Sequence, residues 1–319
     1  MATVTPAVSG GPPRVDLSGN PRRHFREKAF KRLFLAAGLS SIVISVAIVA
    51  SLIGESVTFL RNIDLGTLWS DGWFPRRNLY DIKTLFVGSL LVTGVGMVIA
   101  TPLGLGAAIY LAEYARPGVR RVLKPIVELL AGIPSIVIGF FAFAWISPQI
   151  VDRIFPDASG FNLAAAGIGV GLLVTPLVAS VSEDAMRAVP QSLREASYGM
   201  GARKVTTVLR VVFPAAISGI VAALILAISR AIGETMVVAL AAGGSGGALF
   251  NTDIARPGQT ITAAMASLAS GTDQVAGGGG TGAGAAFNSL FFLGLLLFIV
   301  TFLLNLVGDL FVRRIRERY

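Results

Sequence analysis

Two kinds of reactive side chain are missing or nearly missing from this 319-residue chain. Cysteine is absent, and histidine occurs once, as His24. The absence of cysteine excludes disulfides, thiolate catalysis and cysteine-based metal sites, and it leaves the redox compartment open. A single histidine in a basic N-terminal arm provides no material for multi-histidine metal sites, for proton relays or for a Ser/His/Asp triad in the apolar segments.

Charged residues are also scarce. They make up 14% of the chain, against roughly 25% in an average soluble domain. Hydrophobic residues make up 54%, and the mean hydropathy is +0.73. This composition is typical of membrane proteins.

Six apolar runs are long enough to cross a bilayer as helices, which takes about 20 residues. The runs are Leu33–Ile53, Thr84–Ala112, Pro125–Val151, Ala158–Ser182, Val211 to about Ala242, and about Asn288 to Val312. We therefore predict an all-α, polytopic membrane protein with six transmembrane helices.

The positions of lysine and arginine predict the orientation, because positive charges stay in the cytoplasm. With the N-terminus inside, residues 1–32, 113–124, 183–210 and 313–319 carry 20 of these residues, and the outer loops carry 6. Both termini are thus predicted to be cytoplasmic. A basic arm could also bind RNA or anionic lipid, but the net charge of +9 is explained by topology, so we expect no nucleic acid.

Motifs that bind nucleotide phosphates are absent. No G-x-x-x-x-G-K-[ST] string occurs, and the glycine patterns "GVGMVIATPLGLGAAIY" and "GIGVGLL" lie inside apolar runs. Small residues there favour close helix packing over dinucleotide binding. We expect no cofactor, no metal and no catalytic residue, so the chain is predicted not to be an enzyme.

A cytoplasmic segment before the fifth run reads "PQSLREASYGMGARKVTTVLRVVFPAAISG". It predicts a short helix over Gln191–Gly199, a turn at Gly199 and Gly201, and a membrane helix opened by Pro214. Arg194 and Glu195 are expected to be charged flanks of the short helix. From the residues alone, a helix that docks on another protein and an ordinary connecting loop are equally good interpretations.

The same segment carries a resemblance to a known family. The segment resembles the EAA loop of importer permeases of the ATP-binding cassette (ABC) superfamily. The matching pattern is Glu195-Ala196-Ser197, then three residues, Gly201, nine residues, Val211, one residue and Phe213-Pro214. The strings "ELLAGIPSIVIGFFAF" and "SRAIGETMVV" resemble the permeases of the high-affinity phosphate importer, and "GETMVV" is more similar to the C-type permease than to the A-type. The resemblance covers about residues 30–315.

The resemblance implies the type I ABC importer permease fold, the plasma (inner) membrane and several partners. These are a second permease (PstA-like), an ATPase dimer (PstB-like) that hydrolyses the ATP, and an external phosphate-binding protein (PstS-like). It also implies that Glu195, Ala196, Gly201 and Ala202 couple the chain to the ATPase. The expected domains are a disordered basic arm (1–32), a first transmembrane helix (33–60), an external loop (61–83), the permease domain (84–312, with its coupling loop at 190–214) and a basic tail (313–319).

Charged residues inside the apolar runs are candidates for the phosphate pathway. Arg230 and Glu234 are four residues apart, so on one helix they would share a face, and the carboxylate could neutralise the guanidinium. We predict that Arg230 attracts phosphate and that Glu234 prevents the ion from being trapped. A purely structural ion pair is the alternative.

A second polar stripe is expected on the third run. Glu128, Gly132 and Ser135 follow helical spacing, with a kink at Pro134, although a structural partner for Glu128 is the favoured interpretation there. The predicted pathway residues are Arg230, Glu234, Thr235, Ser135 and Glu128.

Other functions stay open at this point. A sulfate or molybdate importer is possible, because the EAA loop does not encode the substrate. A stand-alone secondary transporter would need its own ion-coupling groups, of which the runs hold few, and an intramembrane enzyme lacks catalytic groups.

Overall fold

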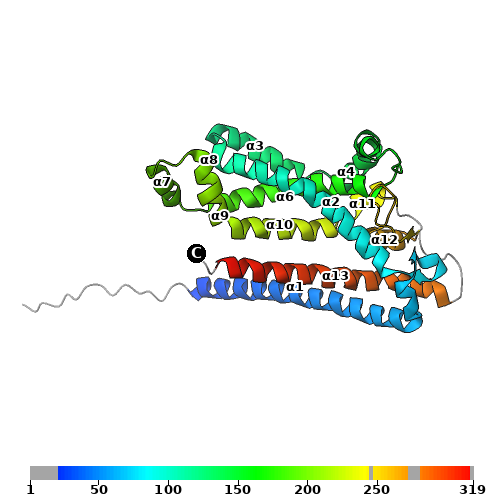
Figure 1. The fold of residues 1–319 in the computed structure, drawn as a ribbon. Helices are drawn as coiled ribbons and strands as arrows, with labels where there is room; N and C mark the ends of the chain where they lie inside the picture. Colours follow the sequence, from blue (N-terminus) through cyan, green and yellow to red (C-terminus); the bar gives the residue numbers. More distant parts are fainter. Residues whose placement is uncertain (1–20, 244–246, 272–280, 317–319) are drawn as a thin grey trace, which may run out of the picture. The chain divides into compact units, whose positions relative to one another are not determined.

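The computed structural model describes residues 21–243, 247–271 and 281–316 (Figure 1). The chain divides into two compact units, residues 1–51 and 52–319. The first unit consists, in its described part, of a single helix, α1, which spans Pro21–Asn62 and continues into the second unit. Residues 21–32 are therefore helical, and the expectation of a disordered arm is wrong for them; residues 1–20 lie outside the described residues.

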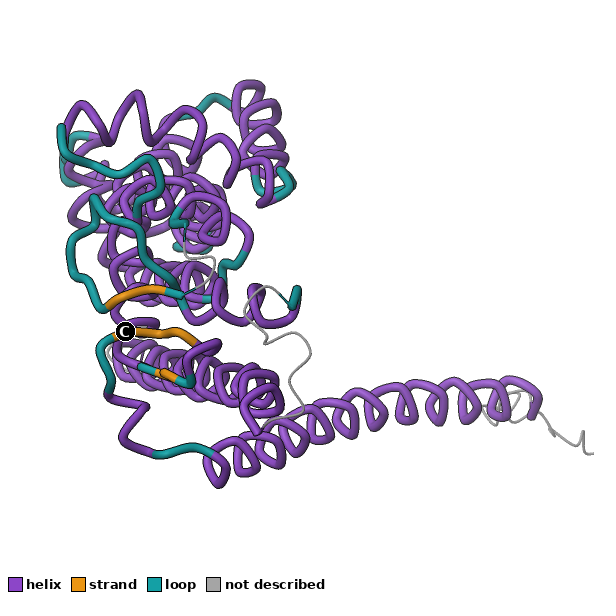
Figure 2. The backbone as a smooth tube through the Cα atoms, turned by 90° about the vertical axis from the view of Figure 1, so that its right-hand side faces the viewer, coloured by secondary structure: helices purple, strands orange, loops and turns teal. Residues whose placement is uncertain are grey.

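The second unit is almost entirely helical (Figure 2). Its longer α-helices are α2 (Ile82–Ile109), α3 (Pro117–Leu130), α6 (Leu163–Arg187), α7 (Gln191–Gly199), α10 (Ile217–Ile232), α12 (Ile261–Ala269) and α13 (Thr281–Arg316). The shorter ones are α4 (Ser135–Phe141), α5 (Asp152–Ile154), α8 (Lys204–Thr207), α9 (Phe213–Ala215) and α11 (Met236–Ala241). Three π-helical segments, η3 (Tyr110–Tyr114), η4 (Ala142–Val151) and η5 (Val208–Val212), extend α2, α4 and α8, and two 3-10 turns are η1 (Leu65–Trp69) and η2 (Pro75–Arg77).

Five helices in the described part of the chain are long and apolar enough to cross a membrane. A bent pair, Lys204–Ala215 with Ile217–Ile232, brings the number to six if it counts as one span. The multi-pass membrane architecture predicted from the apolar runs is confirmed, but two of the runs are organised differently. The domain boundaries within the chain stay predictions.

The third run is not one helix. Helix α3 ends at Leu130, and α4 begins at Ser135 after a break that contains Pro134. A proline disfavours helical geometry in the residue before it, so the chain cannot continue α3 through Ile133. The candidate span is Ser135–Ile154 instead of Pro125–Val151.

The fifth run is bent by 69° at Ala216 and its helix ends at Ile232. Pro214 lies inside the first part of the bent pair, where it lacks the N–H that would bond one turn back. The π-helical segment η5 just before it loosens the same turn. Pro214 therefore precedes a kink; the prediction that it opens a membrane helix is wrong.

Helices α2 and α6 form the centre of the core. Glycines from the two predicted patterns allow them to approach closely: a Cβ on Gly104 would lie 2.7 Å from the Cβ of Val178, and one on Gly167 would lie 2.6 Å from that of Val95. The prediction that these glycines serve helix packing is confirmed. Because backbone contacts backbone here, α2 and α6 are tightly coupled.

A small cap precedes α2. It contains an antiparallel three-stranded sheet in the order β2 (Leu79–Tyr80), β1 (Gly72–Phe74), β3 (Ala248–Leu249). Trp73 and Tyr80 are buried in it, and burial raises the pKa of Tyr80 to about 12. The pairing of β3 with β1 holds Ala248–Leu249 of the glycine-rich segment 243–287 within the chain itself.

Candidate functional site

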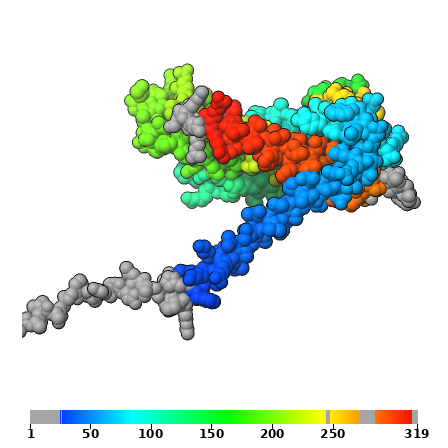
Figure 3. Space-filling model, turned by 90° about the horizontal axis from the view of Figure 1, so that it is seen from below, coloured from blue at the N-terminus to red at the C-terminus, as the bar shows by residue number. Residues whose placement is uncertain are grey.

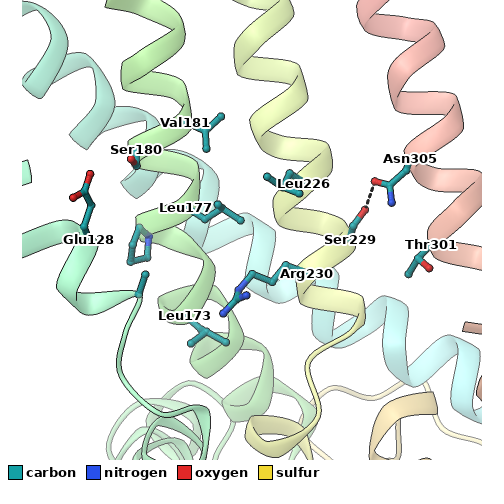
Figure 4. Close-up of a pocket in the computed structure, with 12 residues that line it drawn as sticks. Glu128, Leu173, Leu177, Ser180, Val181, Leu226, Ser229, Arg230, Thr301 and Asn305 are labelled. Atoms are coloured by element: carbon teal, nitrogen blue, oxygen red, sulfur yellow. Dashed lines mark hydrogen bonds between the residues drawn. The ribbon is translucent and has the colours of Figure 1, made fainter. Parts of the chain in front are cut away.

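A groove of about 730 Å³ runs between α3, α6, α10 and α13 (Figure 4). Leu173, Leu177 and Ser180 of α6 form its floor. Arg230 of α10 and Glu128 of α3 line it as its two charged residues, and Asn305 of α13 accepts a hydrogen bond from Ser229 at 2.9 Å. The structure thus brings together two of the residues that the sequence singled out, on an otherwise mostly apolar surface.

Arg230 lies in the last turn of α10, where the helix dipole favours a cation. Its side chain is exposed and extends across the groove toward Leu173 (Figure 4). It makes no hydrogen bond and no ion pair with any described residue. The guanidinium therefore presents its donors to the groove.

Glu234 does not pair with Arg230 in the described structure. Helix α10 ends at Ile232, so Glu234 and Thr235 belong to the connection before α11 and do not share a helical face with Arg230. The Glu234 carbonyl accepts a hydrogen bond from the Thr262 hydroxyl at 2.7 Å, and the Thr235 hydroxyl donates to the Gly233 carbonyl at 3.4 Å. The predicted ion pair on one helix is wrong; a role for Glu234 and Thr235 in the pathway stays a prediction.

The second polar stripe is also divided. Glu128 lies on α3, before the candidate span, and Ser135 is the first residue of α4. The break between the two helices removes the common face that helical spacing predicted. Glu128 lines the groove, whereas Ser135 is not among its lining residues. Glu128 belongs to the predicted run Pro125–Val151, but it lies before the candidate span, which begins at Ser135.

The polar face of α3 is held to the end of α6 by ion pairs. The Nε of Arg120 donates to Glu183 at 2.6 Å, and the Nζ of Lys124 lies 3.1 Å from Glu183 and 2.7 Å from Asp184. Burial alone would lower the pKa of Lys124, but its hydrogen bonds to Asp184 and Glu183 and their charges raise it. The sequence signal for this contact is the helical spacing of Arg120, Lys124 and Glu128, which places all three on one face of α3.

The predicted short helix over Gln191–Gly199 is confirmed as α7. Gly201 has a φ of +78°, a left-handed conformation that favours glycine, and it forms the predicted turn. Glu195, Ala196 and Gly201 are exposed, and Ala202 is half-buried. These four residues are thus free, within this chain, to contact another protein; their coupling role stays a prediction.

Arg194 differs from its neighbours on α7. The sequence predicts a charged flank of the short helix, and the structure shows that Arg194 is only 9% exposed and pairs with Glu113 of η3 at 2.8 Å. No local pattern could have revealed this pair, because the two residues are far apart in the sequence.

The two ends of the second unit carry different elements. Helix α7 projects at one end of the helices, near the C-terminal end of α13, whereas α12 and the sheet lie at the other end (Figures 1 and 3). Charged surface residues such as Arg187 and Lys204 gather at the α7 end.

The chain is similar to known transport proteins. Residues 100–319 match the family described as binding-protein-dependent transport system inner membrane component. The chain is 34% identical over 232 residues to the probable ABC transporter permease protein YqgH of Bacillus subtilis, over 71% of this chain and 75% of that protein. It is 31% identical over 302 residues, 89% of each chain, to the phosphate transport system permease protein PstC of Mesorhizobium japonicum.

A solved structure has the same fold. The chain resembles one in the bacterial alginate ABC transporter in complex with alginate pentasaccharide-bound periplasmic protein, with a TM-score of 0.61 and 18% identity over 90% of this chain and 97% of that one. This likeness concerns the fold alone. The prediction of an all-α permease fold of the type I ABC importer kind is confirmed.

Proposed function

Because the chain belongs to the family of binding-protein-dependent transport system inner membrane components, we propose that it is a permease subunit of an ATP-driven phosphate importer. The name of the Mesorhizobium relative, which is similar over 89% of its length, supports phosphate as the substrate. In this proposal the chain conducts the ion, and a separate subunit hydrolyses ATP.

The observation that carries the substrate proposal is the guanidinium of Arg230, which lines the groove and pairs with none of the residues that the structure describes. A guanidinium matches the oxygens of phosphate with two parallel hydrogen bonds, and it stays charged at every physiological pH. A charged residue inside a membrane protein is costly and commonly marks a substrate or ion pathway, which supports such a place for Arg230.

The groove also has features that would let phosphate leave. Its floor of Leu173 and Leu177 offers no hydrogen bonds, and Glu128 on the opposite wall repels anions. A transport site must bind an ion strongly enough to admit it and weakly enough to release it. In our proposal one cation attracts phosphate, and the apolar floor and the carboxylate limit how long it stays.

We propose that a second, PstA-like permease completes the pathway at the groove. A PstB-like ATPase dimer would contact the exposed face of α7 at Glu195 and Ala196, and a PstS-like binding protein would deliver phosphate at the end of the sheet. Closure of the ATPase dimer would displace α7 and open the groove outward, which is an alternating-access mechanism.

We further propose that both termini face the cytoplasm. The excess of lysine and arginine in residues 1–32, 113–124, 183–210 and 313–319 supports this orientation, and so does the position of α7 near the end of α13 (Figure 1). Reporter fusions at Arg120, Lys204 and Tyr319 should be cytoplasmic, and a fusion at Asp71 external. A fusion at Lys204 that reports from outside would place α7 on the wrong side for an ATPase.

The function is tested by reconstituting the chain with these three partners in liposomes that contain ATP at the ATPase side. We expect phosphate uptake that requires ATP, the binding protein and the ATPase together. Uptake of labelled phosphate is then measured with an excess of sulfate, molybdate or unlabelled phosphate. If sulfate or molybdate inhibits this uptake as strongly as unlabelled phosphate does, the substrate assignment to phosphate is wrong. Uptake without the ATPase would indicate a secondary transporter.

A further inference from the structure

Arg194 holds α7 to the rest of the second unit. Of the nine residues of α7, all within the described part of the chain, only Arg194 is buried. Its Nε and Nη2 donate to Oε1 of Glu113 at 3.2 and 2.8 Å. Its Nη1 donates to the carbonyl of Val189 at 2.6 Å, and Nη2 also donates to the carbonyl of Met186 at 2.8 Å.

These bonds use four of the five N–H groups of the guanidinium. They join three elements: α7 itself, the π-helical segment η3 that ends α2, and the C-terminal end of α6. The carbonyls at a helix end lack partners within the helix, and a cation there is also favoured by the helix dipole. The guanidinium therefore satisfies several groups at once.

Separation of α7 from both η3 and the end of α6 would break all of these bonds together. Glu113 has a side chain that is only 6% exposed, so it would be left as a buried charge without its partner. Movement of α7 together with α6 and η3 breaks none of them. The second kind of movement is therefore strongly favoured.

Helix α6 extends from this contact to the groove. Met186 accepts from Arg194, and Ser180, Leu177 and Leu173 follow on the same helix as the floor of the groove. Helix α2, which ends in η3, packs against α6 along the Gly104–Val178 contact. A displacement of α7 that reaches both helix ends must displace the floor of the groove.

We propose that Arg194 is a positioning residue that makes α7, η3 and the end of α6 one rigid unit and so transmits a displacement of α7 to the groove. The proposal rests on the proposed function, because it assumes that an ATPase moves α7. Arg194 itself contacts neither phosphate nor nucleotide in this proposal.

Two conservative variants test it in the complete reconstituted complex. Arg194→Lys keeps the charge but loses the planar fork that reaches Glu113 and the two carbonyls. Glu113→Gln keeps the shape but removes the acceptor's charge. We expect each to lower the phosphate transported per ATP hydrolysed by about fivefold, within the usual range of coupling between sites. The yield of complex and the ATPase rate without binding protein should stay unchanged.

Arg187→Gln is the matched control, because Arg187 is exposed in the last turn of α6 and lines the same pocket as Glu113 and Arg194, but makes none of the hydrogen bonds of the contact. We expect it to leave the transport ratio unchanged. Hydrogen exchange adds a second readout: amides of α7 should exchange faster in Arg194→Lys and not in Arg187→Gln.

Three results would overturn the proposal. One is an unchanged transport ratio in both Arg194→Lys and Glu113→Gln. Another is failure of both variants to assemble, which would make Arg194 a folding residue only. The third is an equal loss in Arg187→Gln. Failure of the proposed function gives a different result. The wild-type complex would then hydrolyse ATP faster when the binding protein is added but would take up no phosphate. The effect of Arg194→Lys on that stimulation of ATP hydrolysis would still test the role of Arg194.

Discussion

Arg194 and Arg230 are both surrounded by an apolar membrane protein, but their hydrogen bonding differs. Arg194 is 9% exposed and donates to a carboxylate and two carbonyls. Arg230 is exposed to the groove and donates to no described residue. A guanidinium with four of its five N–H groups occupied fixes the positions of its neighbours, whereas one whose donors bond to no described residue is available to an anion. The two sites thus separate the structural use of arginine from its use in binding.

The largest expected difference between them is in stability. Arg194→Ala should lower the free energy of unfolding by about 3–5 kcal/mol, because it leaves Glu113 buried without a partner. Arg230→Ala should not lower it, because Arg230 makes no hydrogen bond with a described residue that would be lost. Thermal unfolding of the purified chain in detergent measures both. Equal losses would remove the distinction between the two arginines.

The second difference is in transport. Arg230→Gln should lower phosphate uptake about a hundredfold, because two hydrogen bonds to a charged group are worth roughly 3 kcal/mol or more. Arg230→Lys should recover little, since an ammonium lacks the paired donors. Uptake is measured in vesicles at equal complex yield. Near-normal uptake by Arg230→Gln would exclude the guanidinium from the pathway.

The contact between α2 and α6 lies between the two arginines: α2 ends in η3, which pairs with Arg194, and α6 lines the groove that holds Arg230. Gly104→Ala should destabilise the chain by about 1–3 kcal/mol, because its methyl group would overlap Val178 in a packed core. Gly106→Ala is the control, since a Cβ there meets nothing within 4 Å. Thermal unfolding compares them. Similar melting temperatures for both variants would mean that the helices separate easily at Gly104.

Gly201→Asp tests the turn that follows α7. A left-handed residue other than glycine costs roughly 1–2 kcal/mol, and in the proposed complex the new charge would face the ATPase. We expect normal insertion but ATP hydrolysis without transport. A Cβ at Gly201 would meet no atom within 4 Å among the described residues of this chain. A steric effect of the new side chain would therefore come from contact with a partner. Gly199→Asp adds the same charge two residues away without the left-handed φ, and an equal loss there would assign the effect to charge alone.

The smallest effect is expected at Glu234. Glu234→Gln should change uptake by less than about fivefold, because an exposed ion pair is worth at most about 1 kcal/mol and the structure joins Glu234 to no described cation. Arg230→Met with Glu234→Leu should be as inactive as Arg230→Met alone. Normal uptake by this double variant would restore the interpretation of a structural ion pair.

The sequence by itself determined the features that depend on local chemistry. Long apolar runs predict membrane helices because a lipid-exposed backbone must bond internally. The segment from Pro190 to Gly201 predicted the bounds of α7, since a proline and a left-handed glycine set the two ends. The small residues at Gly104 and Gly167 predicted close helix packing.

The tertiary structure alone decided which charged residues meet. A helix end at Ile232 separates Glu234 from Arg230, and the break at Pro134 separates Glu128 from Ser135, although both pairs have helical spacing. The folding of α3 back along α6 places Glu128 and Arg230 on one groove, and the end of α2 brings Glu113 to Arg194. Spacing in the sequence fixes contacts only within an unbroken helix, and ion pairs between helices depend on how the whole chain packs.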